Sequence, residues 1–101
     1  MNAKIQVERD ALAAFCRKHH IAKLSFFGSV LRDDFAPQSD VDVLVEFEAD
    51  HVPGLLAFCG MEEELSKILD GRRIDLLTPA SLSPRLKPRV LSSAEVQYAE
   101  G

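Results

Sequence analysis

The sequence predicts an α/β (α+β) fold in which helices flank a small mixed β-sheet. Two observations predict it. Apolar residues recur at helical spacing in residues 5–20 and 55–69, and short apolar or β-branched segments lie between and after these two stretches. Strands that alternate with helices are typical of the α/β class. With 101 residues, of which 47% are hydrophobic and 28% charged, we expect a single minimal domain over 1–101 with a small core.

Three helices are expected in addition to a short helical turn at 29–32. Residues 5–20 carry one apolar face, with Leu12, Phe15 and Cys16 among its members. A shorter helix should begin at Ser83-Pro84, because proline is tolerated in a first turn. In residues 55–69 the apolar side chains cover more than one face, so the excess should be buried against a partner or a second copy of the chain. These side chains are Leu55, Leu56, Phe58, Cys59 and Met61.

Strands are expected at residues 23–27, 41–47 and 74–78, with an edge strand at 96–99 in which Tyr98 packs. Residues 41–47 give the clearest signal, because they are rich in β-branched side chains. One helix joins this strand to the next, which predicts a parallel pair with a right-handed crossover. A short helical turn is expected at 29–32 and a loop at 35–39, and we place the first strand antiparallel to the second.

Composition excludes several classes of protein. No apolar stretch approaches the ~20 residues of a membrane helix, and the N-terminus is too polar for a secretory signal, so a cytoplasmic location is expected. Net charge is −4 and the basic residues are scattered, which argues against strong non-specific nucleic-acid binding. Cys16 and Cys59 should act as small hydrophobes. His19-His20 should interact with the C-terminal dipole of the first helix, because no further metal ligands lie nearby in the sequence.

Three carboxylates are the strongest candidates for chemistry. Asp40 and Asp42 are two residues apart at the start of a strand, so they should project to the same side while Val41 points into the core. Asp75 lies near the start of the expected parallel neighbour. Such carboxylates repel unless a cation lies between them, and Mg²⁺ prefers oxygen ligands. We therefore expect the three to converge closely enough to share Mg²⁺, the alternative being solvated strand ends.

A Gly-Ser pair, Gly28-Ser29, follows the first strand and should feed a short helix. Backbone N–H groups at such a turn receive phosphate oxygens. Ser29 is expected either to contact a phosphate group or to cap the helix. Arg32 is expected either to contact a phosphate group or to pair with a neighbouring carboxylate. Ser39 should shape the loop before Asp40. Together, these residues and the carboxylates predict a site for a metal-bound nucleoside triphosphate.

The same residues carry a resemblance to a known family. The segments "FFGSVLRDDFAPQSDVDVLVEF" and "RRIDLLT" resemble the minimal nucleotidyltransferases of the DNA polymerase beta superfamily over nearly the whole chain. The matching positions are Gly28-Ser29, Arg32, Asp34, Ser39-Asp40-Val41-Asp42 and Asp75.

This resemblance implies an enzyme. It implies Mg²⁺-dependent transfer of a nucleoside monophosphate, with AMP from ATP as the expected case, and two metal ions held by Asp40, Asp42 and Asp75. Gly28, Ser29, Arg32 and Ser39 would then bind the nucleotide. Minimal members are similar to antitoxins that pair with small helical HEPN proteins and add adenylate to a tyrosine of the toxin. We therefore expect a protein adenylyltransferase that is the antitoxin of such a pair.

Two positions depart from the pattern of the family. The turn commonly reads G-S-x-A-R-G, whereas Leu31 and Asp33 replace the alanine and the second glycine here. Both changes would narrow the pocket or weaken nucleotide binding. Two alternatives therefore stay open: an inactive module that silences its partner by binding it, and a transferase subunit that acts on a small molecule or nucleic acid with a second chain. The sequence also leaves open the acceptor, the base and whether the chain forms a homo-oligomer.

Overall fold

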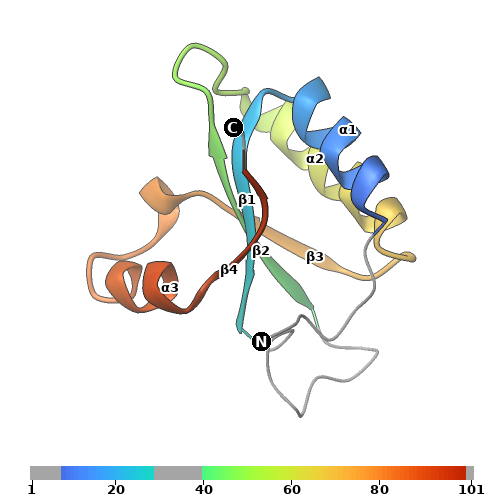
Figure 1. Ribbon diagram of the computed structural model, residues 1–101. Helices are drawn as coiled ribbons and strands as arrows, with labels where there is room; N and C mark the ends of the chain where they lie inside the picture. The colour runs from blue at the N-terminus through green and yellow to red at the C-terminus, as the bar shows by residue number, and fades with distance from the viewer. Residues whose placement is uncertain (1–7, 29–39, 100–101) are drawn as a thin grey trace.

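The computed structural model describes residues 8–28 and 40–99 and contains a four-stranded mixed sheet with helices on both sides (Figure 1). The sheet and its flanking helices confirm the predicted fold class. The elements, in chain order, are α1 (Arg9–Lys18), β1 (Ile21–Phe27), β2 (Val41–Phe47), α2 (Leu55–Ile68), β3 (Ile74–Leu77), the 3₁₀ helix η2 (Pro79–Ser81), α3 (Lys87–Ser93) and β4 (Glu95–Ala99).

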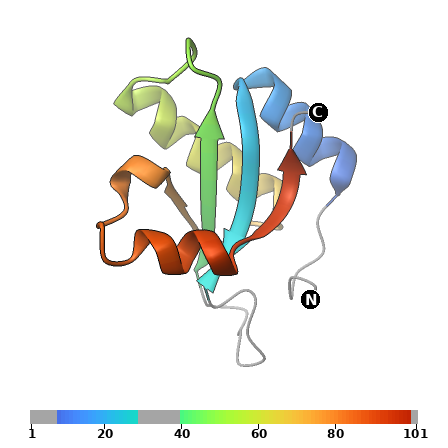
Figure 2. The ribbon, with the colours of Figure 1, turned by 60° about the vertical axis from the view of Figure 1, so that its left-hand side comes forward.

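The strand order is β3-β2-β1-β4, with β1 antiparallel to both β2 and β4 and with β3 parallel to β2. Helix α2 makes the crossover between the two parallel strands, as predicted, and β4 forms one edge of the sheet, as expected (Figure 2). Tyr98 on β4 is partly buried against the core, which confirms its packing role.

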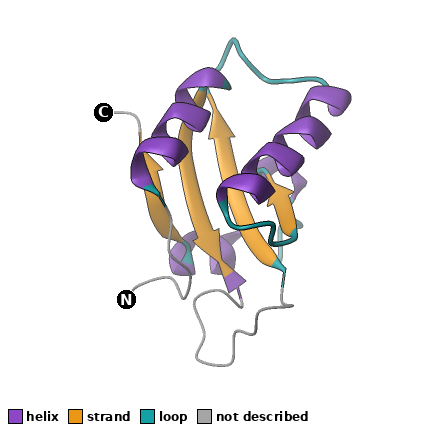
Figure 3. Cartoon of the chain, turned by 90° about the vertical axis from the view of Figure 1, so that its right-hand side faces the viewer, coloured by secondary structure: helices purple, strands orange, loops and turns teal. Residues whose placement is uncertain are grey.

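Helices α1 and α2 cover one face of the sheet and enclose the core between themselves and the strands (Figure 3). Strand alternation decides which side chains enter it: Val41, Val43 and Val45 are fully buried, whereas Asp42 between them is only partly buried. The remaining buried members are Leu12, Phe15, Cys16, Ile21, Leu24, Phe26, Met61, Leu65, Leu69 and Leu76. The polar side chains of β2 therefore lie on the face opposite α1 and α2.

Element boundaries differ from the prediction at several places: α1 ends at Lys18, α2 at Ile68 and β3 at Leu77, each one or two residues before the expected end. Strand β1 begins at Ile21, β4 begins at Glu95, and α3 begins at Lys87 instead of Ser83-Pro84. Ser83 starts a separate turn, because its carbonyl accepts hydrogen bonds from the amides of Leu86 and Lys87 at 3.1 and 2.9 Å. In α1, Glu8 caps the first turn by accepting a hydrogen bond from the Asp10 amide at 3.1 Å. Residues 1–7 and the predicted turn at 29–32 lie outside the described residues.

The start of α2 confirms part of the predicted apolar excess. Leu55 and Leu56 are 79% and 89% exposed, and Val52 just before the helix is 72% exposed. Met61 was expected to belong to this excess, and that expectation is wrong, because it is buried against the sheet. The identity of the molecule that covers Leu55 and Leu56 stays a prediction.

The two cysteines differ in their surroundings. Cys16 is fully buried, and burial raises the pKa of its thiol to about 12, which confirms that it acts as a core hydrophobe. Cys59 is exposed on α2, so the same expectation is wrong for it. Its position on the outer side of α2 could not be told from the apolar residues around it in the sequence. Within residues 8–28 and 40–99, the helices are too short or too polar to cross a membrane.

Candidate active site

The candidate site lies where the end of β1 meets the start of β2. In the sheet register Phe27 pairs with Asp42, and Asp42 pairs with Asp75 on β3. Directly paired residues on neighbouring strands project to the same face, and neighbouring strands lie about 4.8 Å apart. Asp42 and Asp75 are therefore neighbours on the face opposite the buried valines, and Gly28 follows Phe27 in the same corner. The predicted parallel pairing of the two strands that carry these aspartates is confirmed.

Gly28 makes room for one of these carboxylates. Its φ angle is +76°, in the left-handed region that favours glycine. A Cβ atom at this position would overlap Oδ2 of Asp42. Glycine is thus required both by the turn and by the closeness of the Asp42 side chain. The role predicted for Gly28 was phosphate binding, and the contact with Asp42 adds a second reason for this residue.

Asp40 stands just before β2 and is exposed. The amide of Val41 donates a hydrogen bond to the carbonyl oxygen of Arg73 at 2.8 Å, which ties the start of β2 to the start of β3. Nε of Arg73 lies 3.8 Å from Oδ1 of Asp40. This ion pair is exposed and contributes little stability, but it places a cation beside the carboxylates.

The close approach of the oxygens of Asp40, Asp42 and Asp75 that we expected stays a prediction. Asp40 lies beside Arg73, and like charges repel unless a cation lies between them. The backbone still brings the three to one corner. Their hard oxygen donors fit Mg²⁺ better than any softer metal.

The other predicted nucleotide-binding residues cannot be placed. Ser29, Arg32 and Ser39 lie outside the described residues, together with the departures at Leu31 and Asp33. Their roles stay predictions. Of the predicted site, the structure therefore describes Gly28 and the three aspartates.

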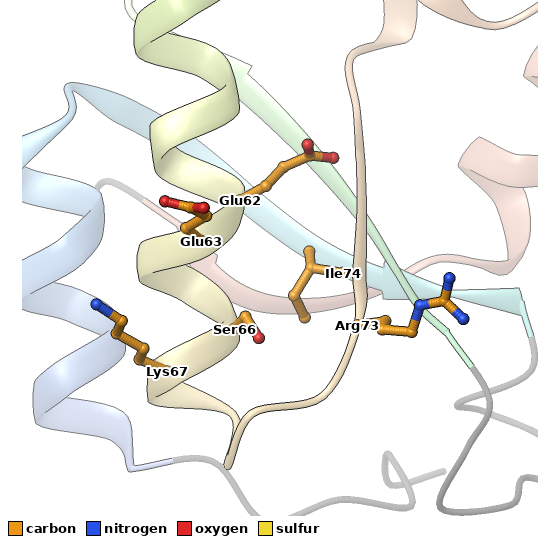
Figure 4. Close-up of a pocket in the computed structure, with 6 residues that line it drawn as sticks. All are labelled: Glu62, Glu63, Ser66, Lys67, Arg73 and Ile74. Atoms are coloured by element: carbon orange, nitrogen blue, oxygen red, sulfur yellow. The ribbon is translucent and has the colours of Figure 1, made fainter.

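A hollow of about 490 Å³ lies between α2 and β3 (Figure 4). It lies on the other side of the sheet from Asp75, because its lining residue Ile74 alternates with Asp75 along β3, although Arg73 both lines it and pairs with Asp40. Oε2 of Glu62 accepts a hydrogen bond from the amide of Leu76 at 3.1 Å. This carboxylate therefore provides the hydrogen-bond acceptor for a backbone amide of the edge strand β3. The side chain of Arg73 extends away from α2 (Figure 4). The hollow is lined by Glu62, Glu63, Ser66, Lys67, Arg73 and Ile74.

Sequence reasoning missed a second polar cluster at the opposite end of β1 and β2. His20 was assigned to the helix terminus without further ligands, yet the structure places Glu48 and His51 beside it. Residue His20 precedes β1 and Glu48 follows β2, so antiparallel pairing alone could have indicated that they meet. His19 instead lies 2.9 Å from a carboxylate oxygen of Glu64 on α2.

Comparison with known proteins agrees with this geometry. Residues 8–96 match the nucleotidyltransferase domain family. Protein adenylyltransferase MntA of Thermococcus cleftensis is 40% identical over 78 residues, which are 77% of this chain and 74% of that protein. A solved structure of a candidate minimal nucleotidyltransferase has a TM-score of 0.69 at 35% identity and covers 85% of each chain.

The fold also resembles a chain of a solved complex from Shewanella oneidensis, in which a tri-AMPylated HEPN toxin is bound to an MNT antitoxin. The TM-score is 0.64 at 22% identity, covering 90% of this chain and 69% of that chain. At this identity the likeness concerns the fold. The family match over residues 8–96 and the aspartates paired beside a glycine turn lead to one conclusion. This chain belongs to the nucleotidyltransferase domain family and has its polymerase beta-like fold.

Proposed function

We propose that this protein is a Mg²⁺-dependent protein adenylyltransferase that transfers AMP from ATP to a helical HEPN-type toxin and is the antitoxin of that pair. The observation that carries the proposal is the register of Asp42 with Asp75 beside Gly28. Identity of 40% to a protein adenylyltransferase supports adenylate as the transferred group, and the likeness to the HEPN–MNT complex supports the partner. The cytoplasm is the expected compartment.

Asp40, Asp42 and Asp75 are the residues that would hold the metal, since all three offer carboxylate oxygens in one corner of the sheet. Bound Mg²⁺ supplies charge neutralisation for the transferring phosphate. Asp42 is held firmly for this purpose, because its neighbours Val41 and Val43 are fully buried. Gly28 keeps the space beside its carboxylate open.

The reaction is an in-line displacement at the α-phosphorus of ATP. The oxygen of an acceptor hydroxyl forms the new bond, the bond to the bridging oxygen of the β-phosphate breaks, and pyrophosphate leaves. We assign to Asp75 the task of orienting that hydroxyl and taking its proton. To Ser29, Arg32 and Ser39, with the backbone at Gly28, we assign the binding of the triphosphate. These residues therefore contribute position and electrostatics to the transfer.

Intact-mass measurement of the partner tests the proposal. The full chain is incubated with a candidate HEPN protein, Mg²⁺ and each of ATP, GTP, CTP and UTP in turn. We expect the partner to gain the mass of one or more AMP groups with ATP, and no gain when Asp40 and Asp42 are both replaced by Asn.

Two other outcomes would replace the proposal. Tight binding of the partner without any mass gain would favour the silent binding module, with Leu31 and Asp33 as the first residues to revert to alanine and glycine. Transfer to a small molecule or nucleic acid, but not to the protein, would favour a transferase subunit with a different acceptor.

A further inference from the structure

The cluster of His20, Glu48 and His51 lies at the end of the sheet opposite the aspartate corner. Two backbone hydrogen bonds hold it together: the Glu48 amide donates to the His20 carbonyl at 2.9 Å, and the His51 amide donates to the Glu48 carbonyl at 2.9 Å. His20 directly precedes β1, Glu48 directly follows β2, and His51 lies in the loop before α2. The fold itself therefore brings them together.

The side chains already have nearly the spacing of a metal site. Oε1 of Glu48 lies 3.9 Å from Nδ1 of His20 and 3.7 Å from Nδ1 of His51. The ligand atoms of the three residues all lie within 4.8 Å of one another. In a tetrahedral zinc site with bonds of about 2.0–2.1 Å, ligand atoms are separated by about 3.4 Å. The Glu48 oxygen is within about half an ångström of this spacing from each imidazole, and the widest-spaced pair would have to approach by up to about 1.4 Å.

The two imidazole rings are stacked, with centroids 3.8 Å apart and an angle of 13° between their planes. The in-plane lone pairs of stacked rings run parallel, so at least one ring must turn out of the stack for both Nδ1 atoms to reach one ion. Both side chains are about half exposed, which leaves room for that rotation.

The backbone of His20 fixes where its side chain begins. Its φ angle of +58° is the left-handed conformation common just after the end of a helix, here α1, and histidine tolerates it better than most residues. The Glu48 amide bonds the His20 carbonyl, so this turn is tied to the end of β2.

We propose that His20, Glu48 and His51 form a binding site for a borderline transition-metal ion, with Zn²⁺ as the reference ion. Two imidazoles and one carboxylate suit Zn²⁺, Co²⁺, Ni²⁺ and Cu²⁺, while Mg²⁺ prefers oxygen ligands. A water molecule would complete four ligands. The bound ion would join the start of β1 to the loop that carries His51 and leads to the exposed Val52 and Leu55.

This site is independent of the adenylyltransferase proposal. Along β2, Glu48 is six residues beyond Asp42, which corresponds to a distance of about 20 Å at ~3.3 Å per residue. The ligand sets share no residue. A negative result for the His20, Glu48 and His51 site would therefore leave the adenylyltransferase proposal standing, and the reverse also holds.

Calorimetric titration of the tag-free full chain with ZnCl₂ tests the proposal. Cys59→Ser in all samples removes an exposed thiol that would compete for the ion. We expect one Zn²⁺ per chain, and at least about tenfold weaker binding in each of the variants His51→Gln and Glu48→Gln. His19→Gln is the matched control, because His19 contacts Glu64 outside the cluster. It should bind Zn²⁺ as the parent does.

Absorption of bound Co²⁺ gives a second readout, since a tetrahedral site with nitrogen ligands produces visible bands that the His51→Gln variant should lose. Circular dichroism checks that each variant is folded. The proposal is overturned if the parent binds no Zn²⁺, if binding survives His51→Gln, or if it disappears when Asp40 and Asp42, rather than the histidines, are replaced.

Discussion

The two ends of the β1–β2 pair use one geometric device for different chemistry. Antiparallel pairing brings the end of β1 to the start of β2, where Gly28 meets Asp42, and the start of β1 to the end of β2, where His20 meets Glu48. The first end presents carboxylate oxygens, and the second presents two imidazoles with one carboxylate. A single strand pair can therefore offer a hard-metal corner and a borderline-metal corner about 20 Å apart.

The largest effect is expected when the aspartate corner is neutralised. Replacing Asp40 and Asp42 together by Asn keeps the shape of both side chains but removes the charges that hold Mg²⁺. Transfer of AMP to the partner should fall by several orders of magnitude, because metal stabilisation of the phosphate supplies much of the barrier reduction. The rate is followed by intact mass of the partner.

The control for this change lies at the other end of the strands. His51→Gln should transfer AMP at the parent rate, since His51 is far from the aspartates. Circular dichroism should show a folded chain for both variants. Equal rates in the double Asn variant and the parent would place the catalytic metal site elsewhere.

A smaller effect is expected from the glycine that separates β1 from the aspartate corner. Gly28→Ala should destabilise the protein by about 1–2 kcal/mol, because alanine is strained at positive φ and its Cβ would meet Asp42. Gly60→Ala is a matched control: it lies in α2 with no neighbouring atoms around the added Cβ, so it should add up to ~1 kcal/mol of stability.

Chemical denaturation measures both changes. A Gly28→Ala protein as stable as the parent would mean that Asp42 does not lie against this turn. Its transfer rate should also fall, since the Asp42 carboxylate must move to accommodate the methyl group.

The smallest effect concerns Glu64 on α2, which contacts His19 and Lys18 at the end of α1. Burial raises the pKa of Glu64, but hydrogen bonds from His19 and Lys18 outweigh it and hold the pKa below its usual value of 4.5. A carboxyl with a depressed pKa in the folded state stabilises the protein above its unfolded pKa, and this contribution is lost as the pH falls through the folded value. The parent should therefore lose stability below about pH 4.5.

Glu64→Gln removes this contribution, so the variant should lack that part of the acid loss. The difference should stay below about 1 kcal/mol, because the pair is partly exposed. Denaturation at several pH values from neutral to acidic measures it. An identical pH profile in parent and variant would show that the contacts of Glu64 with His19 and Lys18 carry no net stability.

Local patterns in the sequence predicted much of the fold and the place of the aspartates in it. The β-branched run of β2 gave its bounds correctly, and Asp40-Val41-Asp42 could be recognised because all three residues lie together in the chain. Asp75 required one topological step, the parallel crossover through α2. Each of these signals lies within one short segment or needs only one inferred strand connection.

The remaining features depend on packing, which no local pattern contains. Met61 and Cys59 lie in the same apolar stretch, yet one is buried and the other exposed, because only one face of α2 meets the sheet. The cluster of His20 with His51 depends on how two distant loops meet. The ion pair of Arg73 with Asp40 likewise depends on how the starts of β2 and β3 meet, which the strand pattern does not include.

A crossed titration tests most directly the claim that the two ends are separate sites. Binding of Mg²⁺–ATP and of Zn²⁺ is measured by calorimetry on the parent, on the Asp40→Asn/Asp42→Asn variant and on His51→Gln, all carrying Cys59→Ser. We expect the double Asn variant to lose Mg²⁺–ATP binding and keep Zn²⁺ binding, and His51→Gln to keep Mg²⁺–ATP binding and lose Zn²⁺ binding. Loss of both ligands in either variant, or of neither, would contradict it.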